Sequence, residues 1–129
     1  MIRNVITGYW RCFQTMGTII HEVMHTLGFL HEHQRLDRRS YIRVLWDNIE
    51  EDKRMNYAPL NFGQETTYGT RYDLYSVMHY DVKKFSRFPG RPTMQILALG
   101  VDAHDVGQRR SMSIGDVQAI NRVYCGDRS

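Results

Sequence analysis

The chain has 129 residues, of which 42% are hydrophobic and 24% are charged, and its formal net charge is +3. This length fits one domain, and these fractions are ordinary for a globular protein and do not indicate disorder. The basic residues are scattered in short pairs such as Arg38-Arg39, with no stripe of Lys and Arg interleaved with aromatic residues. We therefore expect a solvated basic surface and no nucleic-acid partner.

The chain contains no apolar run of the roughly 18 residues that a membrane-spanning helix needs, so we expect no membrane span. Residues 1–10 also lack the apolar core of a signal peptide, which leaves two alternatives: the protein is not secreted, or its true N-terminus is missing. Cys12 and Cys125, the only cysteines, are too far apart in sequence for a CxxC motif. They could pair with each other, pair with cysteines outside this chain, or stay free.

The first expected element is a helix over residues 14–27, which ends at Gly28 because glycine is a natural helix stop. Its apolar positions recur at helical spacing and are Ile19, Ile20, Val23, Met24 and Leu27. Residues 41–46 alternate and are rich in β-branched and aromatic residues, which favours a short strand.

Residues 47–57 are polar, and we expect a short helix there. Glycine and proline residues predict loops over residues 60–70 and 81–93. The last helix is signalled by Ser113 and Asp116, which have the spacing of a capping box. The apolar residues that follow share one helical face and are Ile114, Val117, Ile120 and Tyr124.

A cluster of histidines on the first helix has the spacing of a metal site. His21 and His25 are four residues apart, so they are separated by about 40° around the helix axis and about 6 Å along it. Both side chains can therefore reach one Zn²⁺ ion. Glu22 lies about 100° round from His21, where it can reach a water on the metal but not join the ligands, as a general base must.

The third ligand requires the chain to turn, because a continued helix would carry His31 away from the other two histidines. Gly28 can adopt a positive φ and turn the chain back, so that His31 approaches the same ion from a loop. Three protein ligands leave a fourth position open for water, which is typical of a catalytic zinc site. A bare HExxH arises by chance, but the full HExxHxxGxxH pattern fixes five positions.

Two motifs together resemble a known family. Residues 21–38 resemble the zinc signature of the astacin-family metalloendopeptidases, which are metzincins, and Ser76-Val77-Met78-His79-Tyr80 resembles the astacin Met-turn. Residues 107–125 resemble the last helix of the family. The resemblance implies an α+β metzincin-like fold, mainly its C-terminal subdomain, and one Zn²⁺ ion bound by His21, His25 and His31.

The resemblance also implies roles for individual residues. Glu22 would be the general base and later the acid, Met78 a hydrophobic floor under the metal, and Tyr80 a further zinc ligand that swings away to stabilise the transition state. Arg109 would border the pocket for the residue after the cleaved bond and favour acidic residues there. Arg110 is the alternative, because the register across this loop is uncertain.

Several features depart from the family pattern. Only twenty residues precede His21, and Cys12 and Cys125 match cysteines that the family pairs within a preceding half-domain. Glu32 would contact a mature N-terminus there, and Arg39 stands where the family usually has an acidic residue. We therefore expect residues 1–129 to be a single astacin-like peptidase domain that is truncated at its N-terminus.

The functional expectation is a zinc-dependent endopeptidase that acts on proteins or peptides, with a secreted or extracellular location implied by the family. The alternative is a non-catalytic zinc-binding fragment, inactive because half of the cleft is absent.

Overall fold

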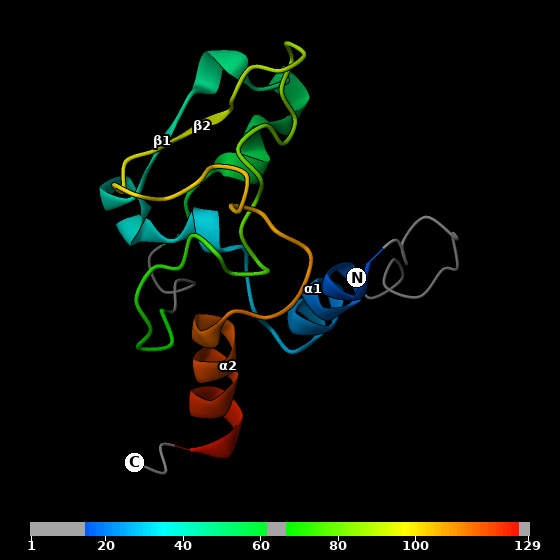
Figure 1. Cartoon of the computed structure of the whole chain (residues 1–129), viewed down its shortest axis with the longest axis vertical. Coiled ribbons are helices and arrows are strands. Elements are labelled where there is room, and N and C mark those ends of the chain that lie inside the picture. Colours follow the sequence, from blue (N-terminus) through cyan, green and yellow to red (C-terminus); the bar gives the residue numbers. More distant parts are fainter. Residues whose placement is uncertain (1–14, 62–66, 127–129) are drawn as a thin grey trace.

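The computed structural model describes residues 15–61 and 67–126. Within these residues, two α-helices and two short strands are connected by turns and 3₁₀ helices (Figure 1). In chain order, the main elements are α1 Met16–Thr26, β1 Ile42–Val44, β2 Met94–Ile96 and α2 Ile114–Ile120, followed by one π-helical turn, Asn121–Cys125. The predicted first helix is confirmed over Met16–Thr26.

The sheet consists of β1 and β2, which pair antiparallel with Arg43 opposite Gln95. The strand predicted within residues 41–46 is confirmed but shorter, because Trp46 already begins a 3₁₀ helix. Strand β2 was not predicted, since three residues are too few to establish an alternating pattern.

The middle of the chain is mostly 3₁₀ helix and turn. The short helix predicted within residues 47–57 is present as the 3₁₀ helices Trp46–Asn48 and Glu51–Tyr57. Two further 3₁₀ helices, Glu32–Gln34 and Leu36–Ser40, connect the end of α1 to β1. These tight turns hold the chain close to the metal-site histidines without a longer regular element.

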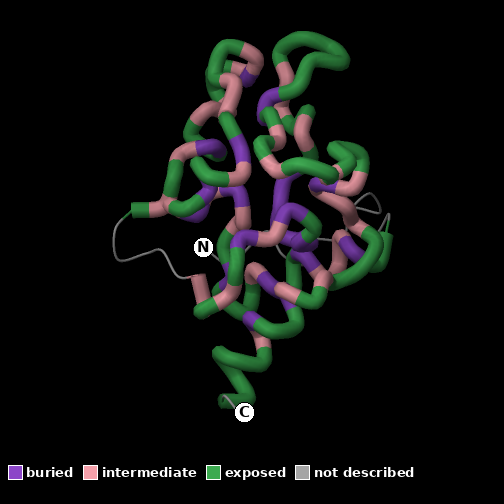
Figure 2. Tube along the Cα trace, turned by 60° about the vertical axis from the view of Figure 1, so that its left-hand side comes forward, coloured by how far each residue is buried: buried purple, intermediate pink, exposed green. Residues whose placement is uncertain are grey.

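Buried side chains form two clusters that meet at residues 77–80. One cluster packs against the sheet and contains Ile42, Ile49, Tyr57, Tyr72, Leu74, Tyr80, Met94 and Val106. The other lies between α1 and α2 and contains Met24, Phe29, Val77, Met78 and Ala119. Figure 2 shows the buried residues along the centre of the molecule and the exposed end of the last helix near the C-terminus.

Helix α2 begins with the predicted capping box. The Ser113 hydroxyl accepts from the Asp116 N–H at 3.0 Å, and the Asp116 carboxylate accepts from the Ser113 N–H at 2.9 Å. The buried residues of α2 are Asp116 and Ala119, whereas two residues of the predicted apolar face point outward, with Ile114 81% exposed and Val117 41% exposed. Further along this face, Ile120 packs against the cluster between α1 and α2, and the Tyr124 hydroxyl donates to the Leu27 carbonyl at 2.6 Å.

Within the described residues, no helix is long and apolar enough to cross a membrane. Cys125 is exposed at the end of the π-helical turn, and Cys12 lies outside the described residues, so the pairing of the two cysteines stays a prediction.

Candidate metal centre

Helix α1 supplies the first two histidines from one side. The Thr15 side chain caps the helix by accepting from the Thr18 N–H at 3.2 Å. Met24 is buried against the core and anchors the helix, and His21 and His25 project into a cleft of about 470 Å³. The helical spacing thus brings both imidazoles to one site, as predicted.

The end of α1 turns the chain towards the third histidine. Gly28 has φ +91°, and its N–H donates to the His25 carbonyl while the Phe29 N–H donates to the Met24 carbonyl, both at 3.0 Å. These two bonds and the buried pair of Met24 and Phe29 form a Schellman motif, which requires a left-handed residue at the glycine position. The Phe29 carbonyl then accepts from His25 Nδ1 at 2.9 Å, so the same turn orients a histidine.

The three imidazoles converge through their Nε2 atoms. His25 Nε2 lies 3.1 Å from His21 Nε2 and 3.1 Å from His31 Nε2. Nitrogens that bind one tetrahedral zinc at about 2.0–2.1 Å lie roughly 3.3 Å apart, so the observed spacing fits a single ion. Among the described residues, these three histidines form the group able to hold a metal.

The tautomers of two of these histidines follow from their backbone contacts. His21 Nδ1 lies 2.8 Å from the Val77 carbonyl, and His25 Nδ1 contacts the Phe29 carbonyl. A carbonyl only accepts, so both Nδ1 atoms carry the proton and both Nε2 atoms present lone pairs. Lone pairs so close together repel each other unless a cation lies between them. Histidines that bind a metal typically donate their other ring N–H to a carbonyl or carboxylate, as both of these histidines do.

Burial keeps two of the imidazoles neutral. It lowers the pKa of His21 to about 4 and the pKa of His31 to about 3, and the neighbouring positive charges act in the same direction. Both groups are therefore unprotonated near neutral pH, which is the form that binds a metal.

The Met-turn passes directly beneath the histidines. All five of its residues, Ser76 to Tyr80, are buried. The Val77 carbonyl orients His21, and the Met78 carbonyl accepts from the Glu32 N–H at 3.1 Å, next to His31. Met78 belongs to the buried cluster between α1 and α2, and its role as an apolar floor under the metal stays a prediction.

Asp116 holds the Met-turn in place from helix α2. One carboxylate oxygen accepts from the Ser76 hydroxyl at 2.6 Å, and the other accepts from the Val77 N–H at 2.9 Å. Because the Val77 N–H contacts Asp116 and the Val77 carbonyl contacts His21, the carboxylate positions a metal-site histidine through the backbone of one residue. Sequence reasoning placed Asp116 in a capping box and missed this second contact.

Tyr80 lies beside the third histidine and lines the cleft. Its ring stacks on His33, with centroids 4.0 Å apart, and lies 4.7 Å from the His31 ring. His33 is fully buried and donates from Nε2 to the Asn56 carbonyl at 2.9 Å. Burial raises the pKa of the Tyr80 hydroxyl, while Arg109 opposes the shift, so the hydroxyl stays protonated and can donate near neutral pH.

The histidine next to Tyr80 is fixed by a second tyrosine. His79 Nδ1 lies 2.7 Å from the Tyr80 carbonyl, so it is the donor, and Nε2 accepts from the Tyr72 hydroxyl at 2.7 Å. Burial lowers the pKa of His79 to about 4. This neutral pair holds the backbone of Tyr80 without adding charge beneath the site.

Glu22 and Arg109 line the same cleft as the histidines. Glu22 is exposed on α1 directly after His21. Arg109 donates from Nη1 to the carbonyls of Gly107, Gln108 and His79 at 3.0–3.2 Å, and its other guanidinium nitrogens make no hydrogen bond within the described residues. Arg110 is exposed and paired with Asp105 at 2.8 Å, so Arg109 is the arginine that faces the cleft.

Gly17 allows the loop that carries Arg109 to approach α1. A Cβ at this position would overlap the Arg109 backbone, so any larger residue would push the loop away from the helix. Gly17 lies one helical turn before His21, and it thereby sets the distance between Arg109 and the metal-site helix. Sequence reasoning did not identify this residue, since glycine inside a helix carries no periodic signal.

Glu32 belongs to a buried polar network behind His31. Its carboxylate accepts from Arg35 Nη1 at 3.1 Å and from the Asp73 N–H at 2.8 Å. Burial raises the pKa of Glu32 to about 7, and the charge of Arg35 opposes this shift. The contact with a mature N-terminus that the resemblance implies for Glu32 stays a prediction.

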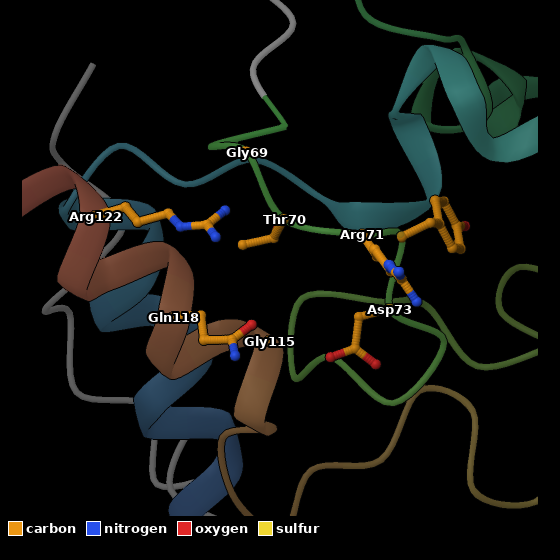
Figure 3. Close-up of a pocket in the computed structure, with 8 residues that line it drawn as sticks. Gly69, Thr70, Arg71, Asp73, Gly115, Gln118 and Arg122 are labelled. Carbon is orange, nitrogen blue, oxygen red and sulfur yellow. The ribbon is translucent and has the colours of Figure 1, made fainter. Parts of the chain in front are cut away.

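A second pocket, of about 450 Å³, lies between residues 69–73 and α2 (Figure 3). Arg71 and Arg122 line it together with Asp73, whose carboxylate accepts from the Ser113 hydroxyl and the Tyr75 N–H. Its lining contains no histidine or cysteine, so it lacks the nitrogen and sulfur ligands of a zinc site.

The family follows from a match over nearly the whole chain. The family model described as Astacin, which is a family of peptidases, matches residues 3–125. The chain belongs to the astacin family. Similar proteins include zinc metalloproteinase nas-9 from Caenorhabditis elegans, 34% identical over 95% of this chain and 22% of the relative. Protein SpAN from Strongylocentrotus purpuratus is 38% identical over 86% of this chain and 18% of the relative.

A solved astacin-family structure confirms the α+β metzincin-like fold. High choriolytic enzyme 1, a hatching enzyme zinc-protease from Oryzias latipes, matches with a TM-score of 0.76 and 37% identity, over 84% of this chain and 52% of that chain. The chain therefore spans about a fifth of the two curated relatives and about half of the solved structure.

Proposed function

We propose that the chain is the zinc-bearing part of an endopeptidase that hydrolyses peptide bonds in proteins or peptides. The observation that carries the proposal is the convergence of three imidazole Nε2 atoms, two of them oriented by backbone carbonyls, at a cleft that Glu22 also lines. Neutral imidazoles at this spacing fit one Zn²⁺ ion, and three protein ligands leave a position open for water.

The reaction divides between the metal and the side chains of the cleft. His21, His25 and His31 would hold a zinc ion, which would supply a water of lowered pKa, about 7, and a Lewis acid for the scissile carbonyl. The Glu22 carboxylate takes a proton from the attacking water and later returns it to the leaving amine. The Tyr80 hydroxyl, which is protonated at neutral pH, donates to the oxyanion of the tetrahedral intermediate.

Arg109 supplies the specificity in this proposal. Its guanidinium lines the cleft with two nitrogens that make no hydrogen bond within the described residues. Such a group binds a carboxylate with parallel charge-assisted bonds, which favours Asp or Glu directly after the cleaved bond.

Two broader expectations belong to the same proposal. Residues 1–129 act as one peptidase domain, and the protein works outside the cell, where the family resemblance puts it. The exposed position of Cys125 fits a cysteine that pairs with a partner beyond the described residues.

The test measures zinc content and peptide cleavage in the same samples. Chelator dialysis should abolish cleavage of a fluorogenic peptide, and added Zn²⁺ should restore it. Glu22→Gln should keep one zinc per chain yet lose roughly 10²–10⁴-fold in turnover, because only the base is removed. Glu51→Gln, on an exposed 3₁₀ helix, is the matched control and should stay active.

Two results would contradict the proposal. Cleavage that persists after complete zinc removal would exclude a metal-dependent reaction. Stoichiometric zinc with no cleavage in the unsubstituted chain would instead favour the alternative of a non-catalytic zinc-binding fragment.

A further inference from the structure

The ring of Tyr80 lies among several other aromatic rings. His33 lies nearly parallel to it, with ring centroids 4.0 Å apart and an angle of 26° between the planes. The rings of His31, Tyr57 and Phe85 lie 4.7–5.9 Å away and are steeply inclined to it. A parallel ring at van der Waals contact blocks movement out of the plane, so the face of His33 sets the plane in which Tyr80 lies.

The ring of His33 is itself fixed by a hydrogen bond at its edge. His33 is fully buried, and its Nε2 donates to the Asn56 carbonyl at 2.9 Å. Its backbone belongs to the 3₁₀ helix Glu32–Gln34, whereas Asn56 belongs to the 3₁₀ helix Glu51–Tyr57. If the ring rotated, a buried carbonyl would lose its donor, which is costly where no water can replace it.

The backbone of the same two 3₁₀ helices is held by Arg38. This arginine is buried, and its Nη1 donates to the His33 carbonyl at 2.9 Å and to the Tyr57 carbonyl at 2.6 Å. Hydrogen bonds from a charged donor are stronger than those between neutral groups. Both the backbone and the ring edge of His33 are therefore fixed before the ring meets Tyr80.

The second ring nitrogen of His33 plays no part in this arrangement. Nδ1 is buried and has no hydrogen-bond partner among the described residues. Because Nε2 carries the proton that it donates to Asn56, Nδ1 presents only a lone pair. The contact of His33 with Tyr80 is therefore made by the flat face of the ring, and an aromatic ring without nitrogens can supply the same face.

We propose that His33 is a positioning residue, which holds the Tyr80 ring so that its hydroxyl meets the oxyanion of the tetrahedral intermediate. The inference rests on the proposed function of Tyr80. His33 is fully buried, whereas Tyr80 lines the cleft, so His33 acts through Tyr80 and not on the substrate. A displacement of about 1 Å at a reacting group can cost on the order of 10²-fold in rate.

The first test is a double-mutant cycle on peptide cleavage. Tyr80→Phe removes the hydroxyl and should lower kcat roughly 10²–10³-fold, as for one oxyanion donor. His33→Leu removes the flat face and should lower kcat by about tenfold or more with KM changed by less than about twofold, because the hydroxyl acts in the transition state. The double variant should be no slower than Tyr80→Phe alone, since a ring without a hydroxyl needs no placement.

Two further variants separate positioning from a general loss of structure. His33→Phe restores an aromatic face and should recover kcat to within about threefold of the unsubstituted chain. Tyr41→Leu removes a stack of the same kind, in which Tyr41 lies on Tyr72 with centroids 4.7 Å apart and outside the cleft lining, and it should leave kcat unchanged. All variants are compared at equal zinc content and at a temperature where each is folded.

The second test needs no turnover. In a chain labelled with fluorotyrosine, the fluorine NMR signal of Tyr80 is assigned by its loss in Tyr80→Phe. This signal should be single and narrow in the unsubstituted chain and in His33→Phe, and broadened or doubled in His33→Leu, because the ring is then no longer held.

An additive loss of kcat in the double variant, or a Tyr80 signal that is equally narrow in His33→Leu, would each overturn the proposal. If the unsubstituted chain cleaves no peptide, the proposed peptidase function fails, and the NMR signal alone then decides whether His33 holds Tyr80.

Discussion

The sequence drew attention to both the Met-turn and helix α2, but the predicted residues of the two regions differ in how far they are buried. Every residue from Ser76 to Tyr80 is buried. On α2 three of the four predicted apolar residues are exposed, and the carboxylate of Asp116 packs inward with Ala119 and the partly buried Ile120. The apolar pattern of α2 therefore identified one packed residue, Ile120, and missed Asp116 and Ala119.

The difference shows that burial depends on partners and not on apolar character alone. The polar groups of the Met-turn have partners within this chain: Asp116 for Ser76 and Val77, and Tyr72 for His79. These contacts offset the cost of removing polar groups from water. On the apolar face of α2, Ile114 and Val117 stay exposed, whereas Ile120 packs against the cluster between α1 and α2.

The strongest test of this comparison removes the anchor of the Met-turn. Asp116→Ala leaves the Ser76 hydroxyl and the N–H groups of Val77 and Ser113 without their acceptor. Bonds to a charged group contribute about 1.5–3 kcal/mol each, so the loss of three should lower the free energy of unfolding by about 4.5 kcal/mol or more. Zinc affinity should fall roughly 10–100-fold, because His21 loses its oriented carbonyl.

Urea unfolding and zinc titration measure these two losses. Asp105→Ala removes an aspartate that is paired with Arg110 at the surface, and it should change neither quantity much. Unchanged zinc affinity in Asp116→Ala would show that the Val77 peptide holds its position without the carboxylate.

The second test uses acid to charge the interior of the Met-turn. The folded-state pKa of His79 is about 4, below its ordinary value of 6.5, because the ring is buried. Its contribution to stability is therefore complete above pH 6.5 and is lost as the pH falls towards 4, by up to about 1.4 kcal/mol per pH unit. His79→Gln should flatten this part of the stability profile, whereas substitution of the exposed His104 by Gln should not.

Glu32 changes the stability with pH in the opposite direction to His79, so the effect of His79 must be measured with variants. Its folded-state pKa is raised to about 7, and its contribution to stability falls as the pH rises from about 4.5 to 7. Subtracting the His79→Gln profile from that of the unsubstituted chain isolates the histidine. Parallel profiles for the two proteins would mean that His79 takes up its proton equally in both states.

The third test concerns Arg109, the arginine that lines the cleft. Arg109→Ala should reduce the preference for Asp over Ala directly after the cut by roughly ten- to a hundredfold, because one charge-assisted contact of about 1.5–3 kcal/mol is lost. Arg110→Ala is the matched control, since Arg110 is exposed and paired with Asp105. Cleavage profiling of a peptide library measures both, and an unsubstituted profile without acidic enrichment would remove Arg109 from the specificity site.

The smallest expected effect is on the outer face of α2. Ile114→Gln should change the free energy of unfolding by less than about 0.5 kcal/mol, because a side chain that is 81% exposed has little packing to lose. A loss of several times this value in the 129-residue chain would show that the apolar face is packed in solution.

The sequence was sufficient for features with a local cause. The paired histidines, the stop at Gly28 and the capping box of α2 each depend on residues within one or two helical turns, and all three are present as predicted. The arrangement of β2, the stack of His33 on Tyr80 and the contact of Asp116 with Val77 join residues far apart in the chain. A single sequence contains no periodic signal for such contacts, so they required the fold.

Gly28 links the metal site to the entropy of the unfolded chain. An unfolded glycine samples both signs of φ, and ordering it costs more than ordering any other residue. The Schellman turn needs this freedom, since φ here is +91°. The turn at Gly28 brings His31 to the other two histidines. The free energies of folding and of metal binding must therefore together offset the conformational entropy that Gly28 loses. The affinity measured for zinc is therefore a net quantity, from which the ordering of this one residue has already been subtracted.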